Sequence, residues 1–387
     1  MLRTTSVTLS RKLTRLYKQC LYSTSSSLTS TYDKLEKFRT SETDCSKHSN
    51  EHLAQFYEVA QEDKKRVFTY GGLPKTFETQ IKTFHETCIM IRQPAIDVIN
   101  CLKTLDYSKP AVRFVLYGKK GCGKSLSLAH ILHFASKENF LIVHVPWVSN
   151  WMRRCKEYSN SEKREGYVDL NLDGAAWLVH FKSQNSHLLS TPEAKTSKEY
   201  VWSKREVTPK DSPISDIIDH GINRVKYASE AVVALCAEIK ELTNRSVFKT
   251  LVAIDGFNAF FYPKTRVYTE KKEVVHPHNV TLTEGFLNLS KTDWKNAAII
   301  VTVDEIAIAA EDHISHLPRY LLGKEGFEHL DPFVPISVSE YNEKEFLSCM
   351  EYYRDRKWVQ GYPGQDEELR FISTSNPYGL MKMCASL

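Results

Sequence analysis

Residues 118–125 read Gly118-Lys119-Lys120-Gly121-Cys122-Gly123-Lys124-Ser125 and match G-x-x-x-x-G-K-[ST] at every fixed position. An apolar run at 112–117 precedes them, and a segment of helical character at 126–134 follows. This strand–loop–helix order is the context in which the pattern forms a phosphate-binding loop. The glycines let backbone N–H groups turn toward a polyphosphate, and the helix adds its positive N-terminal end. The stretch predicts a P-loop nucleotide site.

Each part of this loop has an expected role. The ammonium of Lys124 is expected to reach the β- and γ-phosphates, and the hydroxyl of Ser125 to hold Mg²⁺. Cys122 is either a thiol whose pKa is lowered by lysine and the helix N-terminus, or filler at a variable position. The predicted nucleotide-binding residues are Gly118, Lys119, Lys120, Gly121, Cys122, Gly123, Lys124, Ser125 and Leu126.

A second part of the site is predicted where a strand at about 248–254 ends. The run Leu251-Val252-Ala253-Ile254-Asp255 is apolar and closes on a carboxylate, which is typical of a Walker B element. Asp255 and Ser125 form the predicted metal set, with Asp255 on Mg²⁺ or on its water shell. Hydrolytic P-loop proteins of the strand-inserted class usually carry a second acidic residue directly after the Walker B acid. Here the next residue is Gly256, which cannot accept a proton, so no catalytic residue is predicted.

The residues do not decide whether the nucleotide carries guanine or adenine. The tetrapeptide Ser290-Lys291-Thr292-Asp293 resembles the Asn-Lys-x-Asp signature of guanine-specific GTPases, but it precedes the strand expected at 297–303. We therefore treat it as a decoy. Thr302, near the end of that strand, is either a sensor of the γ-phosphate or a core or capping hydroxyl. The residues alone leave GTP or GDP and ATP as candidates, with Mg²⁺.

Apolar, β-branched runs alternate with helical patterns after residue 110, which indicates stacked βαβ units and an α/β fold. Continuous apolar runs suit a parallel sheet that is buried on both faces. We expect five strands in a mainly parallel sheet, at about 112–117, 140–145, 248–254, 297–303 and 334–338.

The spacing of these strands predicts the domain organisation. The interval of about 146–246 is too long for one crossover and is expected to be a helical insertion, with one helix over 213–242. We expect a presequence at 1–32, an N-terminal extension at 33–110, a P-loop domain at 111–338 and a small C-terminal helical part at 339–387.

The first 32 residues indicate a mitochondrial presequence. They contain five basic side chains and no acidic one, are rich in Ser and Thr, and place several leucines on one helical face. The alternative is a disordered basic tail. No run approaches the roughly 18 apolar residues of a membrane-spanning helix, so no membrane span is predicted.

Charge and cysteine content argue against a protein that wraps nucleic acid and against one held together by disulfides. The formal charge of the chain is +5, and the five basic residues of the arm account for it, which leaves the mature protein near neutral. Extensive wrapping of nucleic acid is therefore not supported, and RNA contacts are expected to be local. Nine scattered cysteines without zinc-like spacing favour reduced thiols over a disulfide framework. The candidate basic patches are Arg153, Arg154 and Lys156 with Lys163 and Arg164, and Lys264 with Arg266, Lys271 and Lys272.

Several further segments together resemble one family. They are the P-loop with its flanks, Tyr200–Glu206, Val252–Gly256, Leu321-Leu322-Gly323-Lys324-Glu325-Gly326-Phe327 and Leu330–Ile336, with Tyr352-Tyr353. From about residue 65 to the C-terminus the chain resembles the death-associated protein 3 family, guanine-nucleotide-binding proteins of the mitochondrial small ribosomal subunit. The Leu-Gly-Lys-Glu-Gly-Phe block is far more specific than the P-loop.

The resemblance implies more than the residues show. It implies an AAA+-like P-loop fold, GTP or GDP bound at 118–125, and Asp255 on the metal side. It also implies a place in the mitochondrial matrix, in the small ribosomal subunit near the large one, with ribosomal proteins and rRNA as partners. A role in apoptosis is implied by the family alone. The alternative is an AAA+-type ATPase or GTPase that acts as an assembly or remodelling enzyme.

Overall fold

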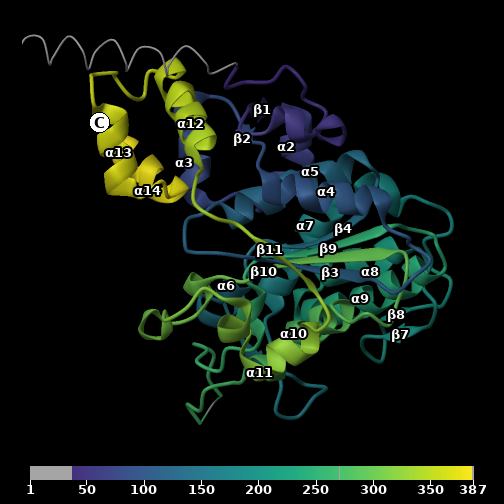
Figure 1. The fold of residues 1–387 in the computed structure, drawn as a ribbon. Helices are drawn as coiled ribbons and strands as arrows, with labels where there is room; N and C mark the ends of the chain where they lie inside the picture. Colours follow the sequence, from purple (N-terminus) through teal and green to yellow (C-terminus); the bar gives the residue numbers. More distant parts are fainter. Residues whose placement is uncertain (1–36, 270, 386–387) are drawn as a thin grey trace, which may run out of the picture.

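The computed structural model describes residues 37–269 and 271–385, so the predicted presequence lies outside the described residues. A five-stranded sheet forms the centre of the molecule (Figure 1). Its strand order is β11-β3-β10-β9-β4, and every neighbouring pair is parallel. The strands are β3 (Val112–Tyr117), β4 (Leu141–Val145), β9 (Thr250–Ile254), β10 (Ala297–Thr302) and β11 (Val334–Ser337). The predicted α/β fold and its five parallel strands are confirmed.

The order of the strands brings the two predicted halves of the site together. β10 lies between β3, which leads into the P-loop, and β9, which ends before Asp255. All five strands run in the same direction, so the residues that follow them meet at one edge of the sheet.

Helices cover both faces of the sheet because alternate strand residues point to opposite sides. One hydrophobic core packs Phe114, Leu116 and Ile300 against α4 (Gln93–Thr104) and α5 (Lys124–Lys137). The other packs Val115, Ile254 and Val301 against the remaining layer. That layer consists of α7 (Asn171–Leu189), α8 (Ile214–Asn223), α9 (Ala228–Asn244), α10 (Thr281–Leu289) and α11 (Pro318–Leu330).

The interval between β4 and β9 carries extra helices, as expected. The single helix predicted over 213–242 is wrong, because the chain reverses at Arg224 and forms α8, a 3₁₀ turn and α9. Gly221 allows close packing there, since a Cβ on it would lie 2.7 Å from the Cβ of Ala231. The interval also contains α6 (Val148–Arg153) and the small hairpins β5 (Ser159–Asn160) with β6 (Val168–Asp169) and β7 (Tyr200–Val201) with β8 (Val207–Thr208).

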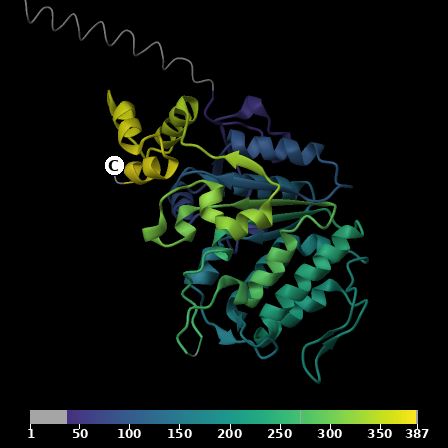
Figure 2. The same ribbon diagram turned by 60° about the horizontal axis from the view of Figure 1, so that its bottom comes forward.

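The segments before β3 and after β11 share a third core. Figure 2 shows the C-terminal helices, in yellow, beside the sheet. Phe84 and Met90 from the N-terminal segment pack with Phe346, Tyr352 and Leu380 from the C-terminal helices. The elements of these two segments are β1 (Phe56–Glu58), α2 (Gln61–Phe68), α3 (Lys75–Phe84), β2 (Cys88–Met90), α12 (Glu343–Asp355), α13 (Gln365–Ser373) and α14 (Pro377–Cys384). Of these, α2 packs into the core that contains α4 and α5. The domain bounds given above stay predictions.

Candidate nucleotide-binding site

The loop between β3 and α5 has the backbone shape that an anion requires. Gly121 and Gly123 have φ of +83° and +96°, values that a side chain would strain. The backbone N–H groups of Gly121, Gly123, Lys124 and Ser125 donate to no other described residue. The last two open α5, so they add the positive end of its dipole to the loop.

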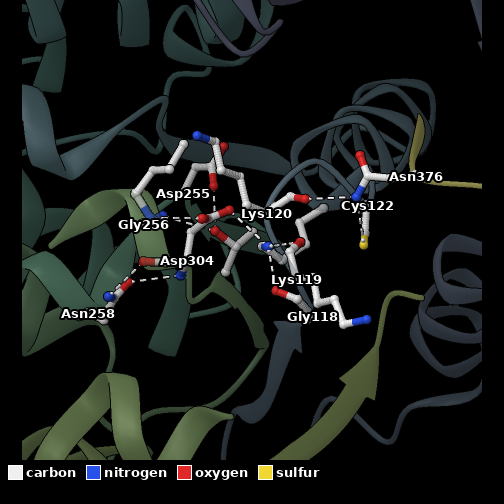
Figure 3. A network of polar contacts seen from close by, with 12 residues as sticks. Gly118, Lys119, Lys120, Cys122, Asp255, Gly256, Asn258, Asp304 and Asn376 are labelled. Atoms are coloured by element: carbon white, nitrogen blue, oxygen red, sulfur yellow. Dashed lines mark hydrogen bonds and ion pairs between the residues drawn. The ribbon is translucent and has the colours of Figure 1, made fainter. Parts of the chain in front are cut away.

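The side chain of Lys124 folds back over the loop, toward Gly118, Lys119 and Asp304, which are labelled in Figure 3. Its Nζ donates to the carbonyl oxygens of Gly118 at 2.7 Å and Lys119 at 2.9 Å. It also lies 2.9 Å from Oδ2 of Asp304, and its side chain is only 2% exposed. The ammonium is thus held at the loop by three oxygens.

Asp255 lies beside Ser125, as the predicted metal set requires. The hydroxyl of Ser125 is hydrogen-bonded to the Asp255 carboxylate. Burial raises the pKa of Asp255 to about 6, while hydrogen bonds from Ser125 and Thr302 act in the opposite direction. One hydroxyl and one or two carboxylates, completed by phosphate oxygens and water, are the ligands that Mg²⁺ takes in P-loop sites. These residues fit the ion.

Thr302 serves as a bridge in this structure. Its hydroxyl donates to Oδ1 of Asp255 and accepts a hydrogen bond from the N–H of Gly256 at 2.9 Å. It is fully buried. Of the two roles left open for Thr302, the contacts are those of a core hydroxyl that orients Asp255.

Asp304 is a site residue that the sequence reasoning missed. It follows β10 by two residues, and its backbone is tied to the side chain of Asn258 by hydrogen bonds of 3.0 and 3.1 Å. The signal was present as an acid just after an apolar strand, the same pattern that identified Asp255.

Gly256 occupies a position that cannot hold a catalytic acid without rearrangement. Its φ is +74°, and a Cβ built on it would lie 2.9 Å from the ring of Trp147. The missing acid next to Asp255 is therefore part of the local packing, in addition to being absent from the sequence.

Three consecutive carbonyl groups of the loop accept hydrogen bonds from outside it. Nδ2 of Asn376 donates to Lys120 O at 2.9 Å, the N–H of Tyr378 to Gly121 O at 3.1 Å, and Nη1 of Arg92 to Cys122 O at 2.5 Å. The sequence reasoning did not select any of these donors.

Of the two alternatives for Cys122, the structure favours a residue that fills a variable loop position over a reactive thiol. It is fully buried, and burial raises the pKa of its thiol, so the reactive thiolate is disfavoured.

A cavity of about 340 Å³ extends from the loop toward the C-terminal helices. Lys124 and Ser125 line one end, and residues of α3, α12 and α14 line the other. Gln80 of α3 also lines it, is 8% exposed, and its amide has no hydrogen-bond partner among the described residues. The volume is in the range of small-molecule sites.

Other candidates lie elsewhere or are already paired. Asp293 of the decoy tetrapeptide pairs with Lys240 at 2.6 Å, before β10 begins and so at the opposite edge of the sheet from the loop. In the basic patches, Lys163 and Arg164 pair with acids of α9 and α10, and Lys264 pairs with Asp312. Within the described residues, no helix is long and apolar enough to cross a membrane.

Comparison with known proteins identifies the family. The family described as "Mitochondrial ribosomal death-associated protein 3" matches residues 89–383. The chain belongs to this family. The "Small ribosomal subunit protein mS29" of Bos taurus is 40% identical over 353 residues, covering 90% of this chain and 88% of that protein. The protein of the same name in Mus musculus is 38% identical and covers 90% and 89%.

Among solved structures, a Walker-type ATPase of Pyrococcus abyssi aligns with a TM-score of 0.42 at 12% identity. The alignment covers 76% of this chain and 65% of that one.

The death-associated protein 3 match includes the P-loop, Asp255, Asp304 and both side-chain donors to the loop, whereas Gln80 precedes it. The Leu-Gly-Lys-Glu-Gly-Phe block has a structural role in α11. Gly323 interrupts the helix with φ of +62°, and Gly326 faces Phe261, where a Cβ would lie 2.9 Å from the ring. In this chain the block therefore shapes α11 against the 3₁₀ turn η4 (Phe257–Phe260) that follows Gly256.

Proposed function

We propose that this chain is a structural component of the small subunit of the mitochondrial ribosome and holds a purine nucleotide with Mg²⁺. Family membership and the names of the bovine and mouse relatives support the ribosomal part. The observation that carries the nucleotide part is the convergence of Lys124, Ser125 and Asp255 at unbonded N–H groups that open α5.

The triphosphate or diphosphate is proposed to lie in the loop 118–126, with Ser125 and Asp255 holding the metal. The nucleoside is proposed to extend into the adjoining cavity of about 340 Å³. The family resemblance favours GTP or GDP. The lining itself does not decide between guanine and adenine, because the amide of Gln80 can pair with either base.

The nucleotide is proposed to stabilise the fold with little or no turnover. A ligand at a hundred times its dissociation constant stabilises the folded state by about 2.7 kcal/mol. Packing of Trp147 over Gly256 leaves no room for a water-activating acid there. The remodelling enzyme, our alternative, would need such a group, and the described residues supply none at this position.

Partners and location follow from the ribosomal proposal. They are mitochondrial ribosomal proteins and rRNA of the small subunit, in the matrix, with the large-subunit interface nearby. The sequence of residues 1–32 supports import into the matrix. An apoptotic role stays a prediction that rests on the family alone.

The test is to isolate the protein from intact mitochondrial ribosomes and identify the small molecule released on denaturation. We expect one guanine nucleotide per chain. The isolated protein should bind Mg²⁺-GDP, and Lys124→Ala should weaken this binding at least tenfold, whereas the exposed Lys210→Ala should not. Ribosomes without nucleotide, or phosphate release at several per second, would refute the proposal.

A further inference from the structure

The C-terminal segment contacts the phosphate-binding loop through hydrogen bonds to the loop's carbonyl groups. We propose that Asn376 and Arg92 are positioning residues that hold the loop in its anion-binding shape, so that nucleotide binding and docking of α12–α14 stabilise each other. The proposal rests on the nucleotide site described above and concerns its regulation.

Peptide geometry determines where the N–H groups of the loop point. A trans peptide is planar, and its C=O and N–H point in opposite directions. Asn376 holds the carbonyl of Lys120, so the N–H of Gly121 must point away from α14. Arg92 holds the carbonyl of Cys122, which turns the N–H of Gly123 away from the Arg92 side in the same manner. These two N–H groups are among those that donate to no described residue.

The start of α14 closely approaches the backbone of the loop at Gly121. A Cβ on Gly121 would lie 2.6 Å from Oδ1 of Asn376 and 2.7 Å from Cβ of Tyr378. The start of α14 therefore packs directly on the loop, and the Tyr378 N–H reaches the Gly121 carbonyl at 3.1 Å. This contact exists only while α14 is docked.

Arg92 ties the same loop to α12. Its Nε and Nη2 each lie 3.0 Å from the carboxylate of Glu345, and Nη2 donates to the carbonyl of Ser339 at 3.0 Å. Both side chains of the Arg92–Glu345 pair are 7% exposed. A second, more exposed pair joins Lys119 of the loop to Glu340 at 2.8 Å. Undocking of the C-terminal helices would therefore remove both the donors to the loop and the partner that fixes Arg92.

These contacts link phosphate binding thermodynamically to docking of α12–α14. If docking of α12–α14 favours the loop shape that binds phosphate, then bound phosphate must favour docking by the same factor. Arg92 lies 30 residues from Cys122, whose carbonyl it contacts, and Asn376 lies 254 and 256 residues from Cys122 and Lys120, whose Sγ and carbonyl it contacts. The coupling thus joins three distant segments of the chain at one site.

Asn376→Ser is the discriminating variant. Oδ1 of Asn376 also caps α14 by accepting from the N–H of Gly379, and serine is an equally good cap. Serine is neutral and too short to reach the Lys120 carbonyl, so the variant removes only the donor to the loop. The matched control is Tyr362→Phe, which removes a hydrogen bond to Glu368 within the C-terminal part and away from the loop.

The experiment measures two quantities on the full chain with Mg²⁺-GDP and Mg²⁺-ATP as probes. The dissociation constant should rise about three- to tenfold in Asn376→Ser and stay within twofold in Tyr362→Phe. Amide hydrogen exchange in α12 and α14 should slow on nucleotide addition in the wild type, and slow less in Asn376→Ser.

The outcomes separate this inference from the proposed function. A wild-type chain that binds neither probe would overturn both. A wild type that binds, with Asn376→Ser binding equally well or with exchange in α12 and α14 unchanged by nucleotide, would overturn only the coupling.

Discussion

The ammonium of Lys124 lies 2.9 Å from a carboxylate oxygen of Asp304, and both side chains are buried. Asp304 is fixed in place, because its other oxygen accepts a hydrogen bond from the N–H of Ile306 at 3.0 Å. In the proposed complex the same ammonium contacts phosphate. Asp304 and the phosphates are therefore competing acceptors for Lys124.

Asp304→Asn should bind nucleotide more tightly when Mg²⁺ is absent. The substitution keeps the side-chain shape but removes a negative charge that both attracts Lys124 and repels phosphate. We expect the dissociation constant for GDP in EDTA to fall about threefold to tenfold, measured by fluorescence anisotropy. Asp312→Asn, which loses a surface lysine partner, should leave it unchanged. Weaker binding by Asp304→Asn would show that the carboxylate assists the ligand rather than competing with it.

The raised pKa of Asp255 predicts how metal binding depends on pH. The carboxyl has a pKa of about 6 in the folded chain, against an ordinary value of 3.8, because it is buried. Mg²⁺ requires the ionised form, so metal affinity should be full above pH 7 and fall as the pH drops through 6. At pH 5.5 we expect the Mg²⁺ affinity of the GDP complex to be about fourfold lower than at pH 7.5.

The control for this experiment is Asp255→Asn, in which added Mg²⁺ should strengthen nucleotide binding little at either pH. Titration of the nucleotide in protein-free solution corrects for protonation of its own phosphates. A wild-type metal affinity that is flat between pH 5.5 and 7.5 would contradict the role given to Asp255.

Local sequence patterns predicted the five strands of the sheet and, within the site, the P-loop and Asp255. The strands were found because each is a mostly apolar run, and the fixed spacing of the P-loop identified Lys124 and Ser125 without any tertiary information. Asp255 followed because an acid ends a strand. These features are determined by neighbours within about ten residues.

The remainder depends on contacts that no local pattern encodes. Asn376 meets the loop from 256 positions away, and Arg92 pairs with Glu345 across 253. The reversal at Arg224 was missed for a related reason, since the apolar spacing of α8 continues into α9, whereas the two helices pack against each other and against α7.

Gly256→Ala should destabilise the protein and should not increase the rate of nucleotide hydrolysis. Left-handed backbone costs an L residue about 1 kcal/mol, and the ring of Trp147 2.9 Å from the new Cβ adds a steric cost. We expect the free energy of unfolding in urea to fall by about 2–3 kcal/mol. Gly166→Ala provides the matched control, because its φ is +79° and a Cβ there meets nothing within 4 Å. Equal losses in both variants would show that Trp147 yields and that the position can accept a side chain.

The amide of Gln80 offers a way to identify the base. It is 8% exposed, lines the cavity beside the loop, and has no hydrogen-bond partner among the described residues. Gln80→Leu should weaken GDP binding about threefold to tenfold, because the edge of the base loses its partner inside a buried site.

Gln80→Glu should shift selectivity toward guanine. A carboxylate accepts hydrogen bonds from N1–H and N2–H of guanine, whereas it faces the N1 lone pair of adenine. We expect the ratio of the GTP and ATP dissociation constants to move about tenfold in favour of GTP, measured by competition against a fluorescent nucleotide. Gln61→Glu makes the same charge change at an exposed site and should leave the ratio unchanged. If Gln80→Glu binds both nucleotides with the wild-type ratio, the base lies outside this cavity or presents a different edge to α3.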